Sequence, residues 1–167
     1  MSPRAACRLE TLGYDAYDYA RGKVDWMAHG LPVEGSLATR PTALSLIRDD
    51  VATCALGDRA DEVEQRIDPT PYGFALALSR SGVVLGRVRR SALEGAAPAA
   101  RVEAVMEPGP STIRPHLTIE ELSERLARSD VRTLIVTDPE GKLLGVVRRG
   151  DVDEAHQRAG TLVERSI

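Results

Sequence analysis

A chain of 167 residues, of which 43% are hydrophobic and 28% charged, has the composition of an ordinary globular protein that can hold one sizeable core or two small ones. Its net charge of −3 and its pI near 5.7 argue against a nucleic-acid-binding surface, which normally carries a clustered positive excess. Only 4% of the residues are aromatic, so Leu, Val, Ile and Ala must supply most of the core.

Targeting and redox signals are sparse in the sequence. No apolar run approaches the roughly 18 residues that a membrane span needs, and no signal-peptide core follows the N-terminus. We therefore expect a cytoplasmic protein without membrane contact. Cys7 and Cys54 belong to no metal-binding or redox spacing and the histidines are scattered, so we expect reduced thiols and no metal site.

Residues 1–36 stand apart from the rest of the chain. Pro3 can start a helix that Gly13 ends, the mixture of aromatic and acidic residues over 14–19 predicts a strand, and a short helix follows up to Gly30. This α-β-α run resembles the final third of a rhodanese domain. The residues that carry the resemblance are Ser2, Ala5, Ala6, Leu9, Leu12, Gly13, Tyr17 to Tyr19, Gly22, Lys23, Trp26, Gly30, Leu31 and Pro32.

The rhodanese resemblance implies a loop with a persulfide-carrying cysteine directly before the first helix, a position that lies ahead of residue 1. Cys7 falls inside the predicted helix, where no ring of backbone N–H groups can lower the pKa of its thiol. We therefore interpret residues 1–36 as a structural appendage that covers apolar surface. A sulfurtransferase-related role is the less favoured alternative.

Residues 37–96 contain the first copy of an internal repeat. A lead-in strand or helix is expected at 43–47, and Asp58 is a plausible N-cap for a helix that reaches Ile67. The continuous apolar run 74–78 predicts a strand that is buried on both faces. A glycine turn then leads into a second strand.

Residues 97–160 contain the second copy, whose helix has unusually complete entry signals. Thr118 and Glu121 predict a capping box at the start of that helix. A buried strand is expected at 131–136 and a return strand at 142–148, before a final helix. The remaining residues from 161 onward are predicted to form a loose tail.

The repeat itself is visible in two segments, VLGRVRRSAL at 84–93 and LLGVVRRGDV at 143–152. Their glycines, Gly86 and Gly145, are 59 residues apart, and the same offset holds backwards without a gap. A period of this size indicates two copies of one supersecondary unit. The predicted fold is α+β: two β-α-β-β-α copies packed with pseudo-twofold symmetry, plus the N-terminal α-β-α segment.

The second copy resembles a CBS domain, the regulatory module named after cystathionine β-synthase. The shared features are the Val-Met opening at 105–106, the Thr-Ile-x-Pro strand at 112–115, the Leu-Ile-Val-x-Asp strand at 134–138, and the Gly-Val-Val run that closes on Asp151. The first copy matches more weakly. The resemblance implies a tandem pair, or Bateman module, that forms a homodimer and whose clefts often bind adenine nucleotides or related adenosyl ligands.

Three kinds of group in the second copy could hold such a nucleotide. Asp151 could accept both ribose hydroxyls, and the N-terminus of the last helix could attract phosphate. Two strands could bind the adenine edge through their backbone, while Ile113 and Val131 cover its faces. The candidate site residues are Asp151, Arg148, Thr112, Ile113, Arg114, Val131, Arg132, Thr133 and Leu134.

The sequence departs from the usual binding signature of the family. Arg148 and Arg89 occupy the position where the signature has a hydroxyl, and Ala92 replaces the acid in the first copy, so at most one nucleotide site per chain is expected. Arg148 could contact phosphate, which would favour ATP or ADP, or it could fill the cleft and abolish binding. Asp151 could bind ribose, or form a capping box with Glu154, and these two roles are compatible.

No catalytic arrangement of nucleophile, base or isolated carboxylates is present in the sequence. We therefore expect a non-enzymatic regulatory or sensor module with AMP, ADP or ATP as its ligand and no required cofactor. The alternative is a ligand-free module for oligomerisation or partner docking. The paired arginines at 89–90 and 148–149 are interpreted as solvated strand ends rather than a nucleic-acid patch.

Overall fold

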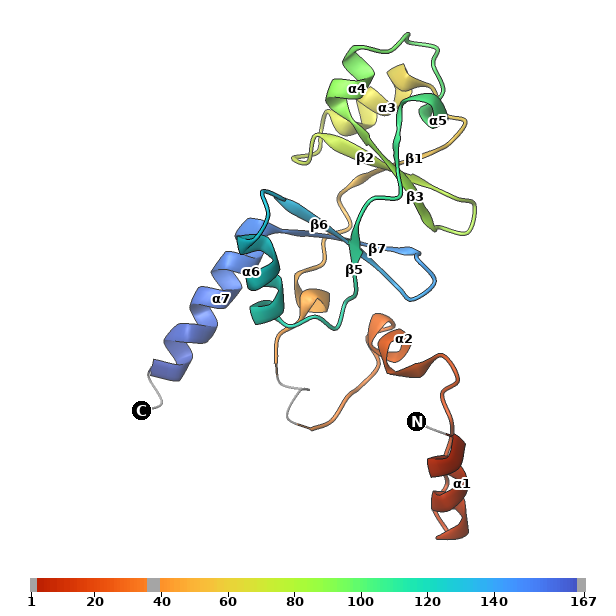
Figure 1. Cartoon of the computed structure of the whole chain (residues 1–167), viewed down its shortest axis with the longest axis vertical. Coiled ribbons are helices and arrows are strands. Elements are labelled where there is room, and N and C mark those ends of the chain that lie inside the picture. Colours follow the sequence, from red (N-terminus) through yellow and green to blue (C-terminus); the bar gives the residue numbers. More distant parts are fainter. Residues whose placement is uncertain (1–2, 36–39, 165–167) are drawn as a thin grey trace.

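The computed structural model describes residues 3–35 and 40–164, which form two small α/β units and an N-terminal helical segment (Figure 1). The elements are α1 (Pro3–Thr11), α2 (Gly22–Ala28), η1 (Ala43–Leu46), β1 (Ala52–Ala55), α3 (Ala60–Ile67), β2 (Phe74–Leu78), β3 (Val84–Arg89), α4 (Arg90–Glu94), α5 (Val102–Val105), β4 (Glu107–Pro108), β5 (Thr112–Ile113), α6 (Ile119–Ala127), β6 (Thr133–Thr137), β7 (Leu143–Arg148) and α7 (Arg149–Glu164). Among these described helices, none is both long and apolar enough to cross a membrane.

The two sheets repeat one topology. The first has the strand order β1-β2-β3-β4 and the second the order β5-β6-β7, each with a parallel pair followed by an antiparallel pair. The registers also agree, because Ala75 pairs with Val88 in the first sheet and Leu134 pairs with Val147 in the second. The predicted α+β fold of two β-α-β-β-α copies is confirmed.

Contacts between the repeats come in pairs that a shift of 59 residues exchanges. Such exchange, in which residue i meets j and the equivalent of j meets the equivalent of i, is the signature of a twofold relation. Val83 bridges to Lys142, its own equivalent. The other exchanged contacts are Thr42 with Thr118 and Arg59 with Arg101, and Arg48 with Val146 and Arg87 with Glu107.

Each repeat places its lead-in helix in the core of the other. η1, which precedes β1, fully buries Ala43 beside Ile119 and Leu122 of the second repeat. α5, which precedes β5, fully buries Val102 beside Val63 of the first repeat. Helices this short gain their stability from packing rather than from their own hydrogen bonds. The repeats are therefore interlocked, and the packed units do not follow the sequence boundary between residues 96 and 97.

A third apolar cluster joins the two sheets. It consists of Val51, Phe74 and Leu76 from the first repeat and Ile135 and Val146 from the second. The first four residues of β2 are buried, as the apolar run predicts. The cluster explains why the units stack end to end in Figure 1, with the second sheet beneath the first.

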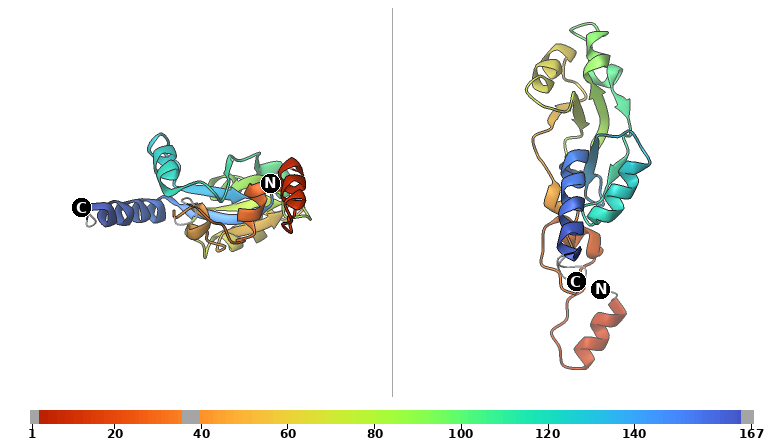
Figure 2. Two further views of the ribbon diagram at one scale, coloured as in Figure 1. Left: turned by 90° about the horizontal axis from the view of Figure 1, so that it is seen from below. Right: turned by 90° about the vertical axis from the view of Figure 1, so that its left-hand side faces the viewer.

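The N-terminal segment differs from its prediction. Residues 14–19 do not form a strand and pair with neither sheet, both of which are built from residues after 51. Tyr14 and Tyr17 are 64% and 86% exposed. α1 lies beyond the stacked repeats in Figures 1 and 2, whereas α2 is held locally by the edge-on contact of Trp26 with Tyr19.

Helix ends confirm one cap prediction and correct others. Thr118 and Glu121 form the complete capping box of α6. Asp58 does not cap α3, because its carboxylate accepts from Ala55 N–H and from Arg66 instead. α7 continues to Glu164, so the loose tail is wrong for 161–164, and 165–167 lie outside the described residues.

Candidate ligand-binding site

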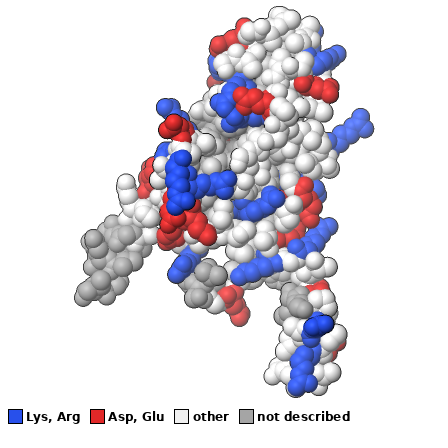
Figure 3. All heavy atoms as spheres, viewed as in Figure 1, with Lys and Arg blue, Asp and Glu red and all other residues white. Residues whose placement is uncertain are grey.

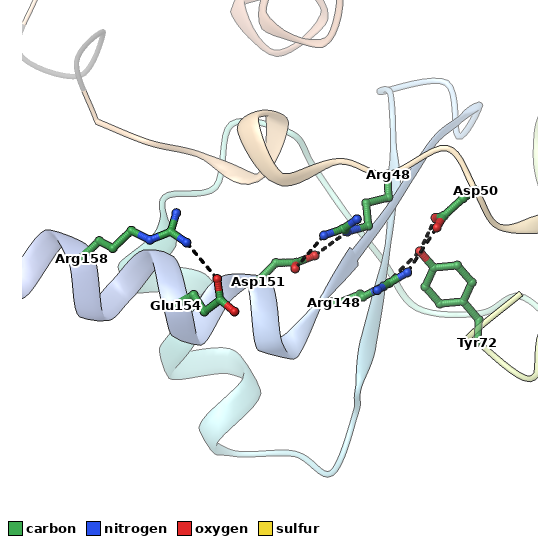
Figure 4. Close-up of polar contacts among 7 residues, drawn as sticks. All are labelled: Arg48, Asp50, Tyr72, Arg148, Asp151, Glu154 and Arg158. Carbon is green, nitrogen blue, oxygen red and sulfur yellow. Dashed lines mark hydrogen bonds and ion pairs between the residues drawn. The ribbon is translucent and has the colours of Figure 1, made fainter.

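Asp151, in the first turn of α7, is held by an arginine that lies 103 residues earlier in the chain. The Arg48 guanidinium donates through Nε to Asp151 Oδ2 at 2.7 Å and through Nη2 to Oδ1 at 3.0 Å (Figure 4). The backbone of Arg48 exchanges two further hydrogen bonds with Val146 on β7, both of 2.9 Å. The lead-in of the first repeat is therefore fixed against the second sheet beside Asp151.

This close approach depends on Gly145 in β7. A Cβ added there would lie 2.3 Å from the Arg48 carbonyl oxygen and 2.7 Å from Ile47 Cγ2. Its φ of +142° is also a conformation that side chains disfavour. The glycine of the repeat motif thus serves the packing of the exchanged lead-in.

Arg148, at the end of β7, faces the first repeat. Its guanidinium carbon lies 5.0 Å from the centre of the Tyr72 ring, in cation–π geometry, and its Nη2 donates to Asp50 Oδ2 at 3.2 Å. The Tyr72 hydroxyl also donates to Asp50, and burial together with this hydrogen bond raises the pKa of Tyr72. Two side chains of the first repeat therefore complete the surroundings of Arg148.

A cavity of about 300 Å³ opens beside the Arg48–Asp151 pair, at the lower end of the range for small-molecule sites. Its lining comes from the lead-in and the first turns of α7: Ser45, Leu46, Ile47, Arg48, Asp151, Glu154 and Arg158. Arg158 donates to Glu154 at 2.9 Å. Figure 4 shows these pairs as a row from α7 to the Asp50–Tyr72 contact, and we call this row with its cavity the Asp151 cleft.

Arg48 sets the charge state of the cleft. Its hydrogen bonds are the largest cause that lowers the pKa of Asp151, with its positive charge adding to the effect. Asp151 in turn raises the pKa of Arg48 above its ordinary value. Asp151 is therefore a carboxylate at neutral pH, able to accept hydroxyl groups but already occupied on both oxygens.

Of the residues singled out from the sequence, Asp151 lines the cavity and Arg148 lies in the same charged row. Ile113 and Leu134 are buried in the core of the second repeat, at 3% and 8% exposure, so neither side chain can cover a base. Val131 is 42% exposed and lies outside β6, which begins at Thr133 rather than at 131.

The other candidates are engaged within the second sheet. Thr112 and Thr133 pair with neighbouring strands, and Arg114 donates to Thr137 of β6. The carbonyl of Arg132 accepts from Arg149 N–H at 2.9 Å. These residues therefore adjoin β6 and β7 rather than the cavity.

The capping alternative for Asp151 does not hold. α7 begins at Arg149, so Asp151 lies inside its first turn, and its oxygens accept from Arg48. Glu154 accepts from Arg158 instead of reaching back along the helix. The capping box proposed for these residues is replaced by two ion pairs.

The pseudo-equivalent cleft of the first repeat has different chemistry. Glu107 stands where the other cleft has Arg48, and it accepts from Arg87 and Arg89 at 2.7 Å each. Ala92 stands in the position of Asp151. This cleft therefore lacks a ribose-binding acid, as the sequence predicts.

The paired arginines are bound to protein groups rather than gathered into a basic patch. Arg90 pairs with Asp68, and Arg149 donates to the Leu126 carbonyl at 2.7 Å. On the face drawn in Figure 3, acidic and basic side chains alternate. The interpretation of these arginines as merely solvated strand ends is therefore incomplete, because their side chains also connect strands with helices and with other strands.

The two cysteines lie in different surroundings. Cys7 is exposed on α1, and Cys54 is buried in β1, where burial raises the pKa of its thiol to about 11. Within residues 3–35 and 40–164, no three metal-ligating side chains converge.

Arg48, Asp50 and Tyr72 were missed by reasoning from the sequence. They belong to the weaker repeat, at positions whose equivalents in the second copy are Glu107, Gly109 and Val131. The offset of 59 residues identifies these positions, but only the exchange of lead-ins shows that they meet Asp151 and Arg148.

Comparison with known proteins supports the assignment of the fold. Residues 102–157 match the sequence model of the CBS domain family. No curated protein sequence matches the chain.

Several solved structures are similar in fold. The cytosolic domain of the Mg²⁺ channel MgtE in complex with ATP has a TM-score of 0.63 at 25% identity, covering 71% of this chain and 51% of that one. The CBS domains of a Streptococcus pneumoniae transcriptional regulator give 0.62 at 22% identity, covering 68% and 97%. CBSX2 in complex with AMP, a protein of Arabidopsis thaliana, gives 0.60 at 19% identity, covering 71% and 98%. The chain thus has the fold of a CBS pair and spans about half of the MgtE domain.

Proposed function

We propose that this chain is a non-enzymatic regulatory module that binds an adenine nucleotide in the Asp151 cleft. The observation that carries the proposal is a carboxylate that lines a cavity and pairs with Arg48, with a second guanidinium, that of Arg148, in the same charged row (Figure 4). A carboxylate can accept two neighbouring ribose hydroxyls, and guanidinium groups bind phosphate in a fork geometry. Similar folds in complex with ATP and with AMP support this ligand class.

Each group has a distinct role in the proposed complex. Asp151 accepts the ribose hydroxyls, and Arg48 and Arg148 bind the phosphates. Tyr72 offers an aromatic face once Arg148 has turned toward the ligand, because the guanidinium covers that ring in the free protein. The proposed site thus keeps Asp151 and Arg148 and takes its other side chains from the first repeat instead of from β5 and β6.

A melting-temperature series with AMP, ADP, ATP and S-adenosylmethionine tests the proposal. A ligand that binds only the native state at 100 times its Kd stabilises that state by about 2.7 kcal/mol. We expect nucleotides to raise the Tm and Asp151→Ala to abolish the shift. Absence of any shift at millimolar nucleotide would reject the proposal.

Asp58→Ala is the matched control for the loss of Asp151. Asp58 is also held by an arginine, and its side chain is 25% exposed, compared with 21% for Asp151. It belongs to the first repeat and is not in the cavity lining. This variant should keep the nucleotide response, so a loss common to both variants would indicate general destabilisation rather than a lost ligand contact.

A ligand-free docking or oligomerisation module is the second candidate function. The bidentate Arg48–Asp151 pair favours it, because the pair already satisfies the acid without a ligand. On this hypothesis Asp151→Ala removes the ion pair with Arg48 but leaves the binding of every partner intact. We further propose a cytoplasmic homodimer that associates through helical faces, which light scattering of the purified chain would test.

We propose that the N-terminal segment serves as a structural appendage rather than in sulfur transfer. Cys7 is exposed on α1, and a sulfurtransferase-related role would require its thiolate to take the sulfane sulfur of thiosulfate, forming a persulfide and releasing sulfite. We expect Cys7 to remain unmodified in a thiosulfate assay.

A further inference from the structure

We propose that Arg48 is a gate that makes the Asp151 cleft selective for phosphorylated ligands. This inference rests on the proposed function, since it specifies which ligands that same cleft admits. By a gate we mean that the Arg48 guanidinium binds both carboxylate oxygens of Asp151 and thereby hinders a ligand from binding them.

Arg48 and a ribose diol compete for the same acceptor, the carboxylate of Asp151. Arg48 makes a charge-assisted contact with each oxygen of Asp151, at 2.7 and 3.0 Å. A ribose diol needs the same two oxygens. A nucleoside that places its diol against both oxygens therefore competes with the guanidinium, and its affinity falls because the ion pair is weakened or broken.

The Arg48 guanidinium can leave Asp151 without unfolding the lead-in. The Arg48 backbone is fixed to Val146 by two hydrogen bonds, and the neighbouring Ile47 packs against the second core. The Arg48 side chain, by contrast, is 44% exposed. The guanidinium can therefore swing away from Asp151 about its own side-chain torsions while the backbone stays in place.

Once displaced from Asp151, the Arg48 guanidinium needs another anionic partner. Glu154 is already paired with Arg158, and Asp50 is already paired with Arg148. A neutral nucleoside gives Arg48 no new anion, whereas a phosphorylated one supplies phosphate oxygens close to the ribose.

The pseudo-equivalent cleft shows that this arrangement is not a general property of the repeat. There, Glu107 replaces Arg48 and Ala92 replaces Asp151, so neither the gate nor the closed acceptor is present. The arginine and the acid occur together in one cleft and are both missing from the other.

The test compares adenosine with ATP on the full chain by titration calorimetry, using wild type, Arg48→Met and Arg66→Met. In Arg48→Met the carboxylate of Asp151 is free to accept the ribose hydroxyls, and the guanidinium group that binds phosphate is lost. We expect adenosine to bind about tenfold more tightly and ATP about tenfold more weakly, as expected for losing one charge-assisted contact worth roughly a factor of ten. Arg66, likewise 44% exposed and paired with an aspartate, should leave both affinities unchanged.

The outcomes separate the gate from the function on which it depends. If ATP binds the wild type but Arg48→Met leaves the ratio of adenosine to ATP affinity unchanged, the gate is refuted and the nucleotide site stands. If neither ligand binds any of the folded proteins, both proposals fail. A cooperative thermal transition of Arg48→Met, and an intermediate ratio in Arg48→Lys, exclude a trivial loss of folding.

Discussion

Substituting Gly145 with alanine tests whether the exchanged lead-in holds the two repeats together. The added Cβ would lie 2.3 Å from the Arg48 carbonyl oxygen, which is backbone and is itself bonded to Val146. The residue would also have to adopt a φ of +142°. Relief of the clash therefore requires the lead-in to move away from β7.

The magnitude follows from two costs. A side chain in a disfavoured backbone region costs on the order of 1–3 kcal/mol. Overpacking of a tight contact costs a further 1–3 kcal/mol, typically. We expect Gly145→Ala to lower the free energy of unfolding by about 2–6 kcal/mol, a large part of the stability of a small protein.

Two other glycines provide matched controls. The equivalent Gly86 has an ordinary φ, and its added Cβ would lie 2.5 Å from Sδ of the flexible Met106 side chain, with the backbone oxygen of Glu107 farther away at 3.1 Å. Gly86→Ala should therefore cost less, about 1–2 kcal/mol at the lower end of overpacking. Gly150, in α7, has no atom within 4 Å of the added Cβ, so Gly150→Ala should be neutral or stabilise by up to about 1 kcal/mol.

Urea denaturation measures the three free energies of unfolding, and hydrogen exchange of residues 42–48 measures release of the lead-in. Faster exchange confined to that segment is expected for Gly145→Ala. The reasoning is refuted if Gly145→Ala and Gly86→Ala cost the same, because the two positions differ in what the Cβ meets and in backbone conformation.

Three further predictions use single contacts. Thr118→Ala removes the capping box of α6 and should cost about 1 kcal/mol in denaturant unfolding, whereas the exposed Thr11→Ala should be near neutral. Leu76 is fully buried between the sheets, so Leu76→Ala should lower the free energy of unfolding by about 2–5 kcal/mol. Leu12→Ala, at a 58% exposed position, is the control. Equal costs for the two variants would contradict the shared core. Because Arg48 lowers the pKa of Asp151, the stability from this pair is complete above the unfolded carboxyl pKa of about 3.9 and is lost as the pH falls through the lower folded pKa. Wild type should therefore lose more stability than Asp151→Asn between pH 6 and 2, a range in which equal losses would argue against the ion pair.

The fold could be predicted where local signals and the repeat agree. The apolar run of β2 and the capping box of α6 each contain their own physical cause, so both appear where the sequence places them. Residues 14–19 alternate like a strand, but a strand also needs an edge to pair with, and a sequence pattern cannot supply one. Asp58 has the residue type of an N-cap, yet Arg66 competes for its carboxylate.

The site could be predicted only in part, because its members come from both repeats. Asp151 and Arg148 belong to a recognisable motif and were identified from it. Arg48 and Tyr72 have no motif of their own, and their proximity to that motif depends on the exchange of lead-ins. Reasoning within one copy therefore assigned the missing half of the cleft to Thr112–Arg114 and Val131–Leu134, the local neighbours in sequence and sheet.

Charge explains how one backbone arrangement persists in two clefts whose sequences have diverged. In the second-repeat cleft, Asp151 would be a half-buried unpaired acid without Arg48, and a lead-in glutamate at that position would repel it. In the first-repeat cleft, Arg87 and Arg89 both pair with Glu107, and Ala92 stands in the position of Asp151, so an arginine at position 107 would place three cations together. The positive charge of Arg48 and the negative charge of Glu107 thus each neutralise the charged groups around them. Reversing the charge at either position should weaken the attachment of that lead-in.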